Sequence, residues 1–332
     1  MSSVAIIDLT FGDAGKGSMT DAYVRRIGAK WTVRFNGGAQ AAHNVVTPDG
    51  RRHVFSQFGS GTLAGAGTFL TRDVLVNPAA MLKEADALRT VGVAHPMKGM
   101  YVDRRCRVTT PWHIALNRLR ETSRGQNRHG SCGMGIGETM LDCIENPGDT
   151  LRVEDIMRPG ELSGRLRRIR VRLLEKALEL RPSAAAAEHM EWFSPESVGM
   201  LYDELRGWSL QAGIVEKPPF SGEDAIVWEG AQGVLLDENF GFHPHTTWST
   251  TTTVNVIQYC KDHNLPLPEF LGLTRSYFTR HGPGPFPTQG EDIAPEQSNK
   301  TNPGSPNSGR GRWTPSCCGT RSACARSCRA SW

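Results

Sequence analysis

Residues 11–18 read FGDAGKGS and lie between a short apolar run, residues 4–7, and a stretch from Met19 that can open a helix. A strand, a glycine-rich turn and a helix in this order are typical of a phosphate-binding loop. The glycines allow backbone N–H groups to approach phosphate oxygens, and the helix N-terminus adds partial positive charge. Lys16 adds a full charge. The stretch therefore predicts nucleotide binding.

Asp13 is an unusual residue for such a loop, because a carboxylate repels phosphate. Its presence is explained if the side chain holds Mg²⁺ or takes up a proton during a reaction. The alternative is an ordinary glycine-rich turn between a strand and a helix, which would bind no ligand.

Three further motifs follow strand-like runs or form rigid turns. Residues 34–44 read RFNGGAQAAHN, and His43 within them is a candidate general acid because an imidazole titrates near neutral pH. Residues 229–237 read EGAQGVLLD, and residues 280–288 read RHGPGPFPT, a turn-rich loop. Each motif alone is a weak signal.

Together and in this order, the four motifs resemble the adenylosuccinate synthetase family, whose corresponding motifs read WGDEGKG, GGHNAGH, EGAQG-x-LLD and STR-x-GAGPFPT. The resemblance extends from about residue 4 to residue 288. It implies an α/β fold with a mostly parallel central sheet flanked by helices and a P-loop-like GTP-binding architecture. It also implies a ligase that uses GTP and Mg²⁺ to join L-aspartate to the purine nucleotide IMP through a 6-phosphoryl intermediate.

The resemblance also implies roles for individual residues. Asp13 matches the base that removes the N1 proton of the purine, and His43 matches the acid that assists phosphate transfer. Gln232 matches a catalytic residue that holds the nucleotide substrate. The Mg²⁺ ligands would be the Asp13 carboxylate and the backbone carbonyl of Ala42, both hard oxygens.

Two binding sites follow from the same resemblance. The implied GTP site comprises Gly12, Asp13, Ala14, Gly15, Lys16, Gly17, Ser18, Ala42, His43 and Asn44. The implied purine nucleotide site comprises Asp13, Lys16, Gln40, His43, Cys132, Gln232 and Thr247.

The chain departs from the family pattern around the substrate phosphate. A family His-Asn pair is replaced by Ala39 and Gln40, and the family's GTTGRGIGP becomes GSCGMGIGE at residues 130–138, so that Met134 replaces an arginine and Glu138 adds negative charge. Three interpretations stay open: the original ligase activity, a divergent ligase for another purine nucleotide, and a non-catalytic nucleotide-binding protein. Phage relatives that act on dGMP alter the Asp13 position, so the aspartate here argues against that substrate.

Residues 304–332 differ in composition from the rest of the chain. They contain five arginines and four cysteines but no Val, Ile, Leu, Met, Phe, Tyr, Asp, Glu or Lys. Such a segment cannot build a packed core. We therefore expect an incomplete synthetase-like domain at residues 1–303 and a disordered tail, which resembles the product of a shifted reading frame. Because the family's aspartate-binding and guanine-reading segments are not recognised beyond Thr288, we expect the C-terminal portion of the fold to be lacking and the activity to be impaired.

The net charge and the cysteines of the chain indicate which partners and which cellular compartment to expect. The net charge of +4 arises from 38 basic and 34 acidic residues, and the tail's arginines account for the excess, so it is no evidence for nucleic acid or membrane binding. The basic run at residues 165–172 is interpreted as the solvated face of a helix. No signal peptide or apolar span is recognised, and scattered cysteines suit a reducing compartment, so we expect a cytoplasmic protein. The family resemblance implies a homodimer.

Secondary structure expected from the pattern also favours an α/β fold. Strand-like runs at residues 5–7, 73–76, 225–227 and 270–273 alternate with helical stretches. One helix is expected over residues 78–89, with Asn77 as its cap and Pro78 in its first turn, and another over residues 111–120.

Overall fold

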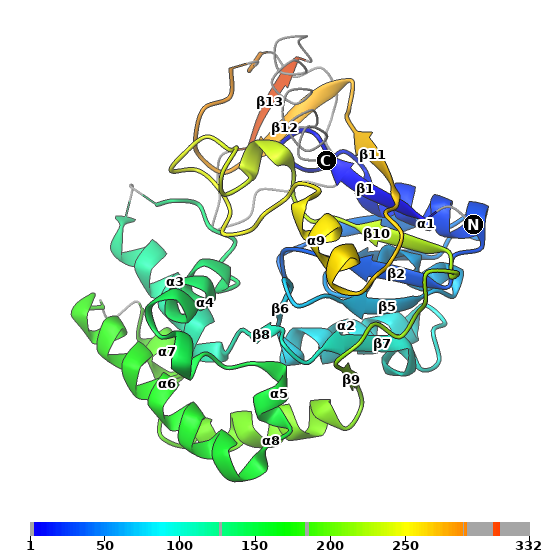
Figure 1. Cartoon of the computed structure of the whole chain (residues 1–332). Helices are drawn as coiled ribbons and strands as arrows, with labels where there is room; N and C mark the ends of the chain where they lie inside the picture. The colour runs from blue at the N-terminus through cyan, green and yellow to red at the C-terminus, as the bar shows by residue number, and fades with distance from the viewer. Residues whose placement is uncertain (1–2, 126–127, 183–185, 288, 291–307, 313–332) are drawn as a thin grey trace.

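The computed structural model describes residues 3–125, 128–182, 186–287, 289–290 and 308–312 (Figure 1). Among these residues, a seven-stranded sheet has the order β11-β1-β10-β2-β5-β7-β9. Every neighbouring pair of strands in it is parallel. The α/β fold with a parallel central sheet, predicted from the sequence, is confirmed.

The bounds of the elements are as follows. The central strands are β1 (Val4–Asp8), β2 (Trp31–Arg34), β5 (Gly67–Leu70), β7 (Met100–Asp103), β9 (Gly213–Val215), β10 (Ile226–Glu229) and β11 (Glu269–Leu273). The smaller sheets contain β3 (His43–Val46), β4 (Arg52–Phe55), β6 (Leu75–Val76), β8 (Arg107–Val108), β12 (Tyr277–His281) and β13 (Ser308–Arg312). The α-helices are α1 (Lys16–Ile27), α2 (Pro78–Thr90), α3 (Pro111–Ser123), α4 (Ile136–Glu145), α5 (Val153–Ile156), α6 (Pro159–Glu179), α7 (Ala187–Glu191), α8 (Ser197–Ser209) and α9 (Val254–Asp262). Short 3₁₀ turns are η1 (Ser60–Ala64), η2 (Pro96–Gly99), η4 (Pro147–Asp149) and η6 (Val234–Leu236).

The apolar sequence of β1 is explained by burial on both faces of the sheet. Successive side chains of a strand point to opposite faces. Ile7 packs in a core with Tyr259 of α9, whereas Ile6 packs in a second core with Val24 of α1. Because α1 and α9 cover opposite faces, β1 has no solvent-facing side and reads as a continuous apolar run.

A third core joins strands β5 and β7 of the sheet to the helical part of the chain, since Leu70 and Val102 belong to it. Trp112 of α3, Leu166 of α6 and Trp208 of α8 are fully buried in it. In Figure 1 helices α3 to α8 gather to one side of the sheet. Within the described residues, none of the helices is both long and apolar enough to cross a membrane.

The basic run on α6 is the predicted solvated face only in part, since two of its five arginines are exposed and the other three are partly buried. Two nitrogens of Arg172 each lie 2.8 Å from the carboxylate of Asp142 on α4, and a third lies 2.9 Å from Asp149. Arg170 donates to the backbone carbonyl of Phe193 at 2.8 Å. These arginines fasten α6 to its neighbours, which sequence spacing alone does not reveal.

The expectations for local structure have mixed outcomes. Helix α2 begins at Pro78, and the Asn77 side chain accepts a hydrogen bond from Ala80 N at 3.1 Å, as a helix cap should. Helix α3 also begins where expected, at Pro111. The predicted strand at residues 73–76 is wrong in extent and place: Val74 N bonds to Thr71 O in a turn, and β6 pairs with β8 outside the central sheet.

Part of the predicted tail is described by the structure. Strand β13 pairs antiparallel with β12, and its five residues fall within the segment expected to be disordered. Residues 304–307 and 313–332 lie outside the described residues. The boundary at residue 303 and the character of the rest of the tail stay predictions.

Candidate functional site

Asp8, at the end of β1, organises the loop at residues 9–15. Its Oδ1 accepts hydrogen bonds from the backbone N–H and the hydroxyl of Thr10, at 2.8 and 2.6 Å. Its Oδ2 accepts from Ala14 N at 2.9 Å and from Nζ of Lys16 at 3.0 Å. Both charged side chains are buried. Sequence reasoning did not single out Asp8, although an acidic residue closing a buried strand is the signal that could have found it.

The backbone of this loop suits an anion. Gly12 and Gly15 have φ angles of 104° and 83°, in the left-handed region that favours glycine. Gly15 caps α1 without a side-chain hydrogen bond. The first N–H groups of α1 therefore have no side-chain cap and can donate to phosphate oxygens.

Asp13 also lies in the left-handed region, with φ at 61°. Its Oδ2 lies 2.7 Å from Nε2 of His281, and its backbone carbonyl accepts a hydrogen bond from Arg275 at 3.1 Å. Burial raises the pKa of Asp13, but the hydrogen bond and charge of His281 and the charges of Lys16 and Arg275 outweigh it, so the pKa lies below its ordinary value. The carboxylate is therefore ionised near neutral pH.

His43, at the start of β3, is paired with a buried carboxylate. Its Nδ1 lies 2.5 Å from Oε1 of Glu229, whose other oxygen accepts a hydrogen bond from Ser60 N at 2.9 Å. Burial lowers the pKa of His43 more than the charge of Glu229 raises it. Burial alone would raise the pKa of Glu229, but His43, Arg34 and the Ser60 hydrogen bond hold it below its ordinary value.

It follows that a neutral His43 donates Nδ1–H to an ionised Glu229, which fixes the tautomer and leaves Nε2 without a proton. In the sequence, Glu229 is only the first residue of the motif at residues 229–237, and the motif assigns it no role. Its role in orienting His43 depends on a contact between residues 186 positions apart.

The sequence motifs meet in space. Ser18 Oγ donates to Asn44 O at 3.3 Å, which ties α1 to the strand that carries His43. Leu235 N donates to Thr10 O at 3.0 Å, which ties the phosphate loop to the segment that carries Gln232. A Cβ at Gly17 would lie only 2.9 Å from His43 Cβ, so the loop and the strand are in close contact.

Two predicted nucleotide-binding amides have unsatisfied polar atoms. Both amide atoms of Gln40 are buried without a hydrogen-bond partner among the described residues, and so is Oε1 of Gln232. A buried amide without a partner carries the full cost of desolvation. Gln232 also has φ at 61°, a strained conformation that residues at functional sites often adopt. Both side chains are therefore suited to a polar ligand.

The residues predicted to bind the substrate phosphate lie on two segments of the chain. Thr247 N donates to Leu236 O at 2.8 Å, and a Cβ at Gly137 would lie 3.2 Å from the Trp248 ring, so the segment of Thr247 adjoins the start of α4. Cys132 is exposed. The added negative charge of Glu138 is balanced by Arg120 at 2.8 Å.

The donor set predicted for a metal suits Mg²⁺ and not zinc. The Asp13 side chain is partly exposed, and Ala42 is exposed. No group of three or more His, Cys, Asp or Glu residues in the described part of the chain could enclose a metal ion. Mg²⁺ is commonly held by one or two carboxylates together with substrate phosphates and water, so one carboxylate and one carbonyl fit it.

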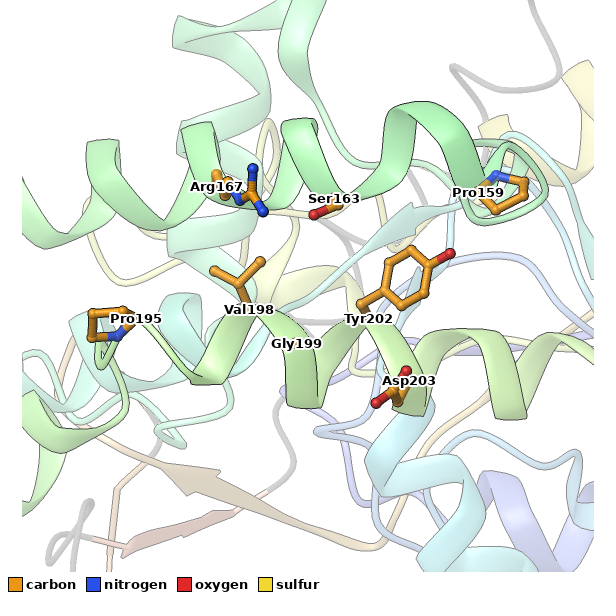
Figure 2. A pocket seen from close by; sticks show the side chains of 8 residues that line it. All are labelled: Pro159, Ser163, Arg167, Pro195, Val198, Gly199, Tyr202 and Asp203. Carbon is orange, nitrogen blue, oxygen red and sulfur yellow. The ribbon is translucent and has the colours of Figure 1, made fainter.

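A surface hollow elsewhere takes no part in this site. It has a volume of about 330 Å³ and lies between α6 and α8, where Ser163, Arg167, Tyr202 and Asp203 line it (Figure 2). None of the predicted site residues lines this hollow.

Comparison with known sequences gives consistent results. The family model described as adenylosuccinate synthetase matches residues 5–314. Adenylosuccinate synthetase of Syntrophobacter fumaroxidans is 31% identical over 294 residues, which cover 87% of this chain and 66% of that protein. The Clostridium perfringens protein of the same name is 30% identical, over 88% of this chain and 66% of its own length. The chain thus spans just under two thirds of the length of these relatives.

Solved structures share the fold. Fully ligated adenylosuccinate synthetase from Plasmodium falciparum superposes with a TM-score of 0.69 at 21% identity, covering 88% of this chain and 66% of that one. Succinoaminodeoxyadenylate synthetase of cyanophage S-2L, bound to dGMP and dATP, gives a TM-score of 0.63 at 19% identity, covering 97% of this chain and 81% of that one.

Proposed function

The chain belongs to the adenylosuccinate synthetase family, and we propose that its site binds GTP with Mg²⁺ and joins L-aspartate to a purine nucleotide, IMP, to give adenylosuccinate. The observation that carries the proposal is the contact of Gly17 with His43, which places the phosphate loop beside a histidine oriented by Glu229.

The proposed reaction begins at the purine base. Asp13 is ionised and takes the N1 proton, and O6 of the purine then attacks the γ-phosphate of GTP to form a 6-phosphoryl intermediate. This transfer releases GDP and converts O6 from a poor leaving group into part of a phosphate. The amine of aspartate then displaces that phosphate from C6 as inorganic phosphate. Catalysis of such a transfer consists mostly of positioning and charge stabilisation.

His43 acts as the acid in this scheme. A phosphate dianion close to Nε2 raises the pKa of the imidazole, and Glu229 stabilises the imidazolium that results. Mg²⁺ held by Asp13 and the carbonyl of Ala42 would neutralise charge on the phosphates. The N–H groups at the start of α1 supply further positive potential to these phosphates, whereas the charge of Lys16 is already balanced by Asp8.

The amides of Gln40 and Gln232 are proposed to bind the purine nucleotide, because their buried polar atoms have no partner within the described chain. Gln40→Leu tests this sharply. The substitution removes no protein hydrogen bond that the structure describes, so folding should be preserved while IMP binding weakens by roughly tenfold, the effect of a lost hydrogen bond of about 1.4 kcal/mol. Gln258→Leu, on the exposed side of α9, is the matched control and should leave binding unchanged.

Phosphate release by the purified chain tests the reaction. Release that requires GTP, IMP and L-aspartate together, with adenylosuccinate identified by mass spectrometry, would support the ligase. Release with another purine monophosphate in place of IMP would instead favour the divergent ligase, for which the altered residues Met134 and Glu138 are the motivating observation. Binding of GTP without any release would favour the non-catalytic alternative, and absence of nucleotide binding would contradict all three.

Two properties accompany the proposal. The family resemblance predicts a homodimer, and the cysteine pattern predicts a cytoplasmic location. Impaired activity also stays a prediction, and the same assay addresses it by comparing the turnover of this chain with that of a longer relative.

A further inference from the structure

Strand β12 presents three alternate residues to the phosphate loop. Tyr277, Thr279 and His281 share one face of the strand, because side chains two positions apart point the same way. His281 lies 2.7 Å from Oδ2 of Asp13, and the Thr279 hydroxyl lies 3.4 Å from the same oxygen. Two residues of β12 therefore contact the same carboxylate oxygen of Asp13.

The backbone of Asp13 is held from the same direction. Arg275 precedes β12 and donates to the carbonyl of Asp13 at 3.1 Å. Its guanidinium group lies over the Tyr277 ring, 4.3 Å from the centroid, and Tyr277 OH accepts a hydrogen bond from it at 2.5 Å. Arg275 is therefore fixed by the strand that also carries His281.

The opposite face of β12 fixes the neighbouring aromatic residue of the loop. Arg280 is buried, lies 4.6 Å from the centre of the Phe11 ring, and donates to the carbonyls of Pro283 and Pro285 at 2.9 and 3.0 Å. Phe11 and Asp13 are thus held by opposite faces of one strand. These contacts fix the position of β12 relative to the loop, and therefore also the position of His281 relative to Asp13.

The conformation of Asp13 explains why such support is needed. A non-glycine residue with φ at 61° is disfavoured and persists only where the surroundings determine it. Here Arg275, just before β12, binds the carbonyl of Asp13, and His281 of β12 binds its carboxylate.

We propose that His281 is a positioning residue that fixes the carboxylate of Asp13 through its Nε2–H hydrogen bond, so that Asp13 meets the nucleotide and Mg²⁺ in one orientation. This inference rests on the proposed function, in which Asp13 is the base and the carboxylate ligand. The competing explanation is an exposed ion pair of little consequence, since the His281 and Asp13 side chains are 42% and 34% exposed.

The experiment compares His281→Leu, which removes the hydrogen-bond donor, with His281→Gln, whose amide restores an N–H donor without charge. The full chain is titrated with a fluorescent N-methylanthraniloyl GTP in the presence and absence of Mg²⁺. His95→Leu makes the same substitution at an exposed histidine that precedes η2 and serves as the control. Crystal structures of the wild type and the leucine variant report the orientation of Asp13.

We expect His281→Leu to weaken Mg²⁺-dependent binding by about tenfold, as loss of one charge-assisted hydrogen bond does, while His281→Gln stays within about threefold of the wild type. In an Asp13→Asn background the leucine substitution should have no further effect, because His281 acts through the carboxylate. The crystal structures should show Asp13 rotated in the leucine variant.

Unchanged binding in His281→Leu would overturn the proposal, and so would equal weakening in the leucine and glutamine variants. Tighter Mg²⁺-dependent binding in His281→Leu would also overturn it, because His281 would then compete with the metal. If the wild type itself binds no GTP analogue, the proposed function fails, and this result is distinct from any difference between the variants. The orientation of Asp13 in the two crystal structures then still decides whether His281 positions the carboxylate.

Discussion

Nζ of Lys16 lies 3.0 Å from Oδ2 of Asp8, and the two side chains are 3% and 0% exposed. The pair sits beneath the phosphate loop, where the same carboxylate also accepts the N–H groups of Thr10 and Ala14. Asp8 therefore has two roles at once: it shapes the loop, and it provides the counter-charge for a lysine that faces no water.

Asp8→Asn is expected to lower the free energy of unfolding by about 3–5 kcal/mol, because breaking a buried pair leaves the lysine charge uncompensated. Urea denaturation followed by circular dichroism measures the change. The matched control is Asp86→Asn, which removes the exposed partner of Arg89 and should cost under about 1 kcal/mol. Equal losses for the two variants would show that burial of the Lys16 pair is unimportant.

Local sequence signals account for much of the fold. The apolar run before the phosphate loop predicts β1, and Asn77 with Pro78 predicts the start of α2, because each depends on residues within a few positions. The pairs that shape the site join distant residues, such as His43 with Glu229 and Asp13 with His281. No periodicity or capping rule links such positions, so the sequence named His43 and Asp13 but not their partners. The expected strand at residues 73–76 is shorter for a local reason, because Val74 closes a turn onto Thr71 and only β6 is left as strand.

Stability is expected to fall in mildly acidic solution because of His113 in α3. Burial lowers its pKa more than Asp142 raises it, and Arg172 and Lys176 lower it further. The folded pKa thus lies below the ordinary value of 6.5 that applies to the unfolded chain. As the pH falls below that value, the unfolded state binds a proton that the folded state does not, so folding is weakened.

His113→Gln should therefore reduce the pH dependence of unfolding between about pH 7 and pH 5, by up to about 1.4 kcal/mol per pH unit. Urea denaturation at a series of pH values measures the slope for the variant and the wild type. All other groups titrate in both proteins, so the difference between the two slopes reports on His113. An unchanged slope in the variant would mean that His113 is protonated equally in both states.

Asp142→Asn is expected to destabilise the helical part of the chain by about 3 kcal/mol, since the substitution removes the charge that pairs with two nitrogens of Arg172. The side chains of Arg172 and Asp142 are only 18% and 3% exposed. Asp149→Asn removes another partner of the same arginine at a more exposed position, and a loss of about 1 kcal/mol is expected. Chemical denaturation ranks the two variants, and a larger loss for Asp149→Asn would refute the order.

Gly17→Ala tests the contact on which the proposed function depends. Alanine is normally preferred over glycine inside a helix, by about 0.5–1 kcal/mol. At Gly17, however, the added Cβ would lie 2.9 Å from His43 Cβ and 3.1 Å from the backbone carbonyl carbon of His43. Because a backbone cannot yield as a flexible side chain does, β3 must move away from α1. We expect a loss of about 1–3 kcal/mol in stability, as for overpacking of a core.

Gly199→Ala in α8 is the control, since a Cβ there meets no atom within 4 Å and should stabilise the protein by about 0.5–1 kcal/mol. The two substitutions should change the stability in opposite directions, which distinguishes steric crowding at Gly17 from the helix propensity of alanine. Thermal or urea denaturation measures the stability of both variants. Displacement of His43 should also weaken binding of the fluorescent GTP analogue by roughly tenfold or more, because small misplacements of a positioned group are costly. The Gly199 variant should bind as the wild type does. Stabilisation by Gly17→Ala with unchanged binding would show that the loop and His43 are not in close contact, and the proposed function would lose its main support.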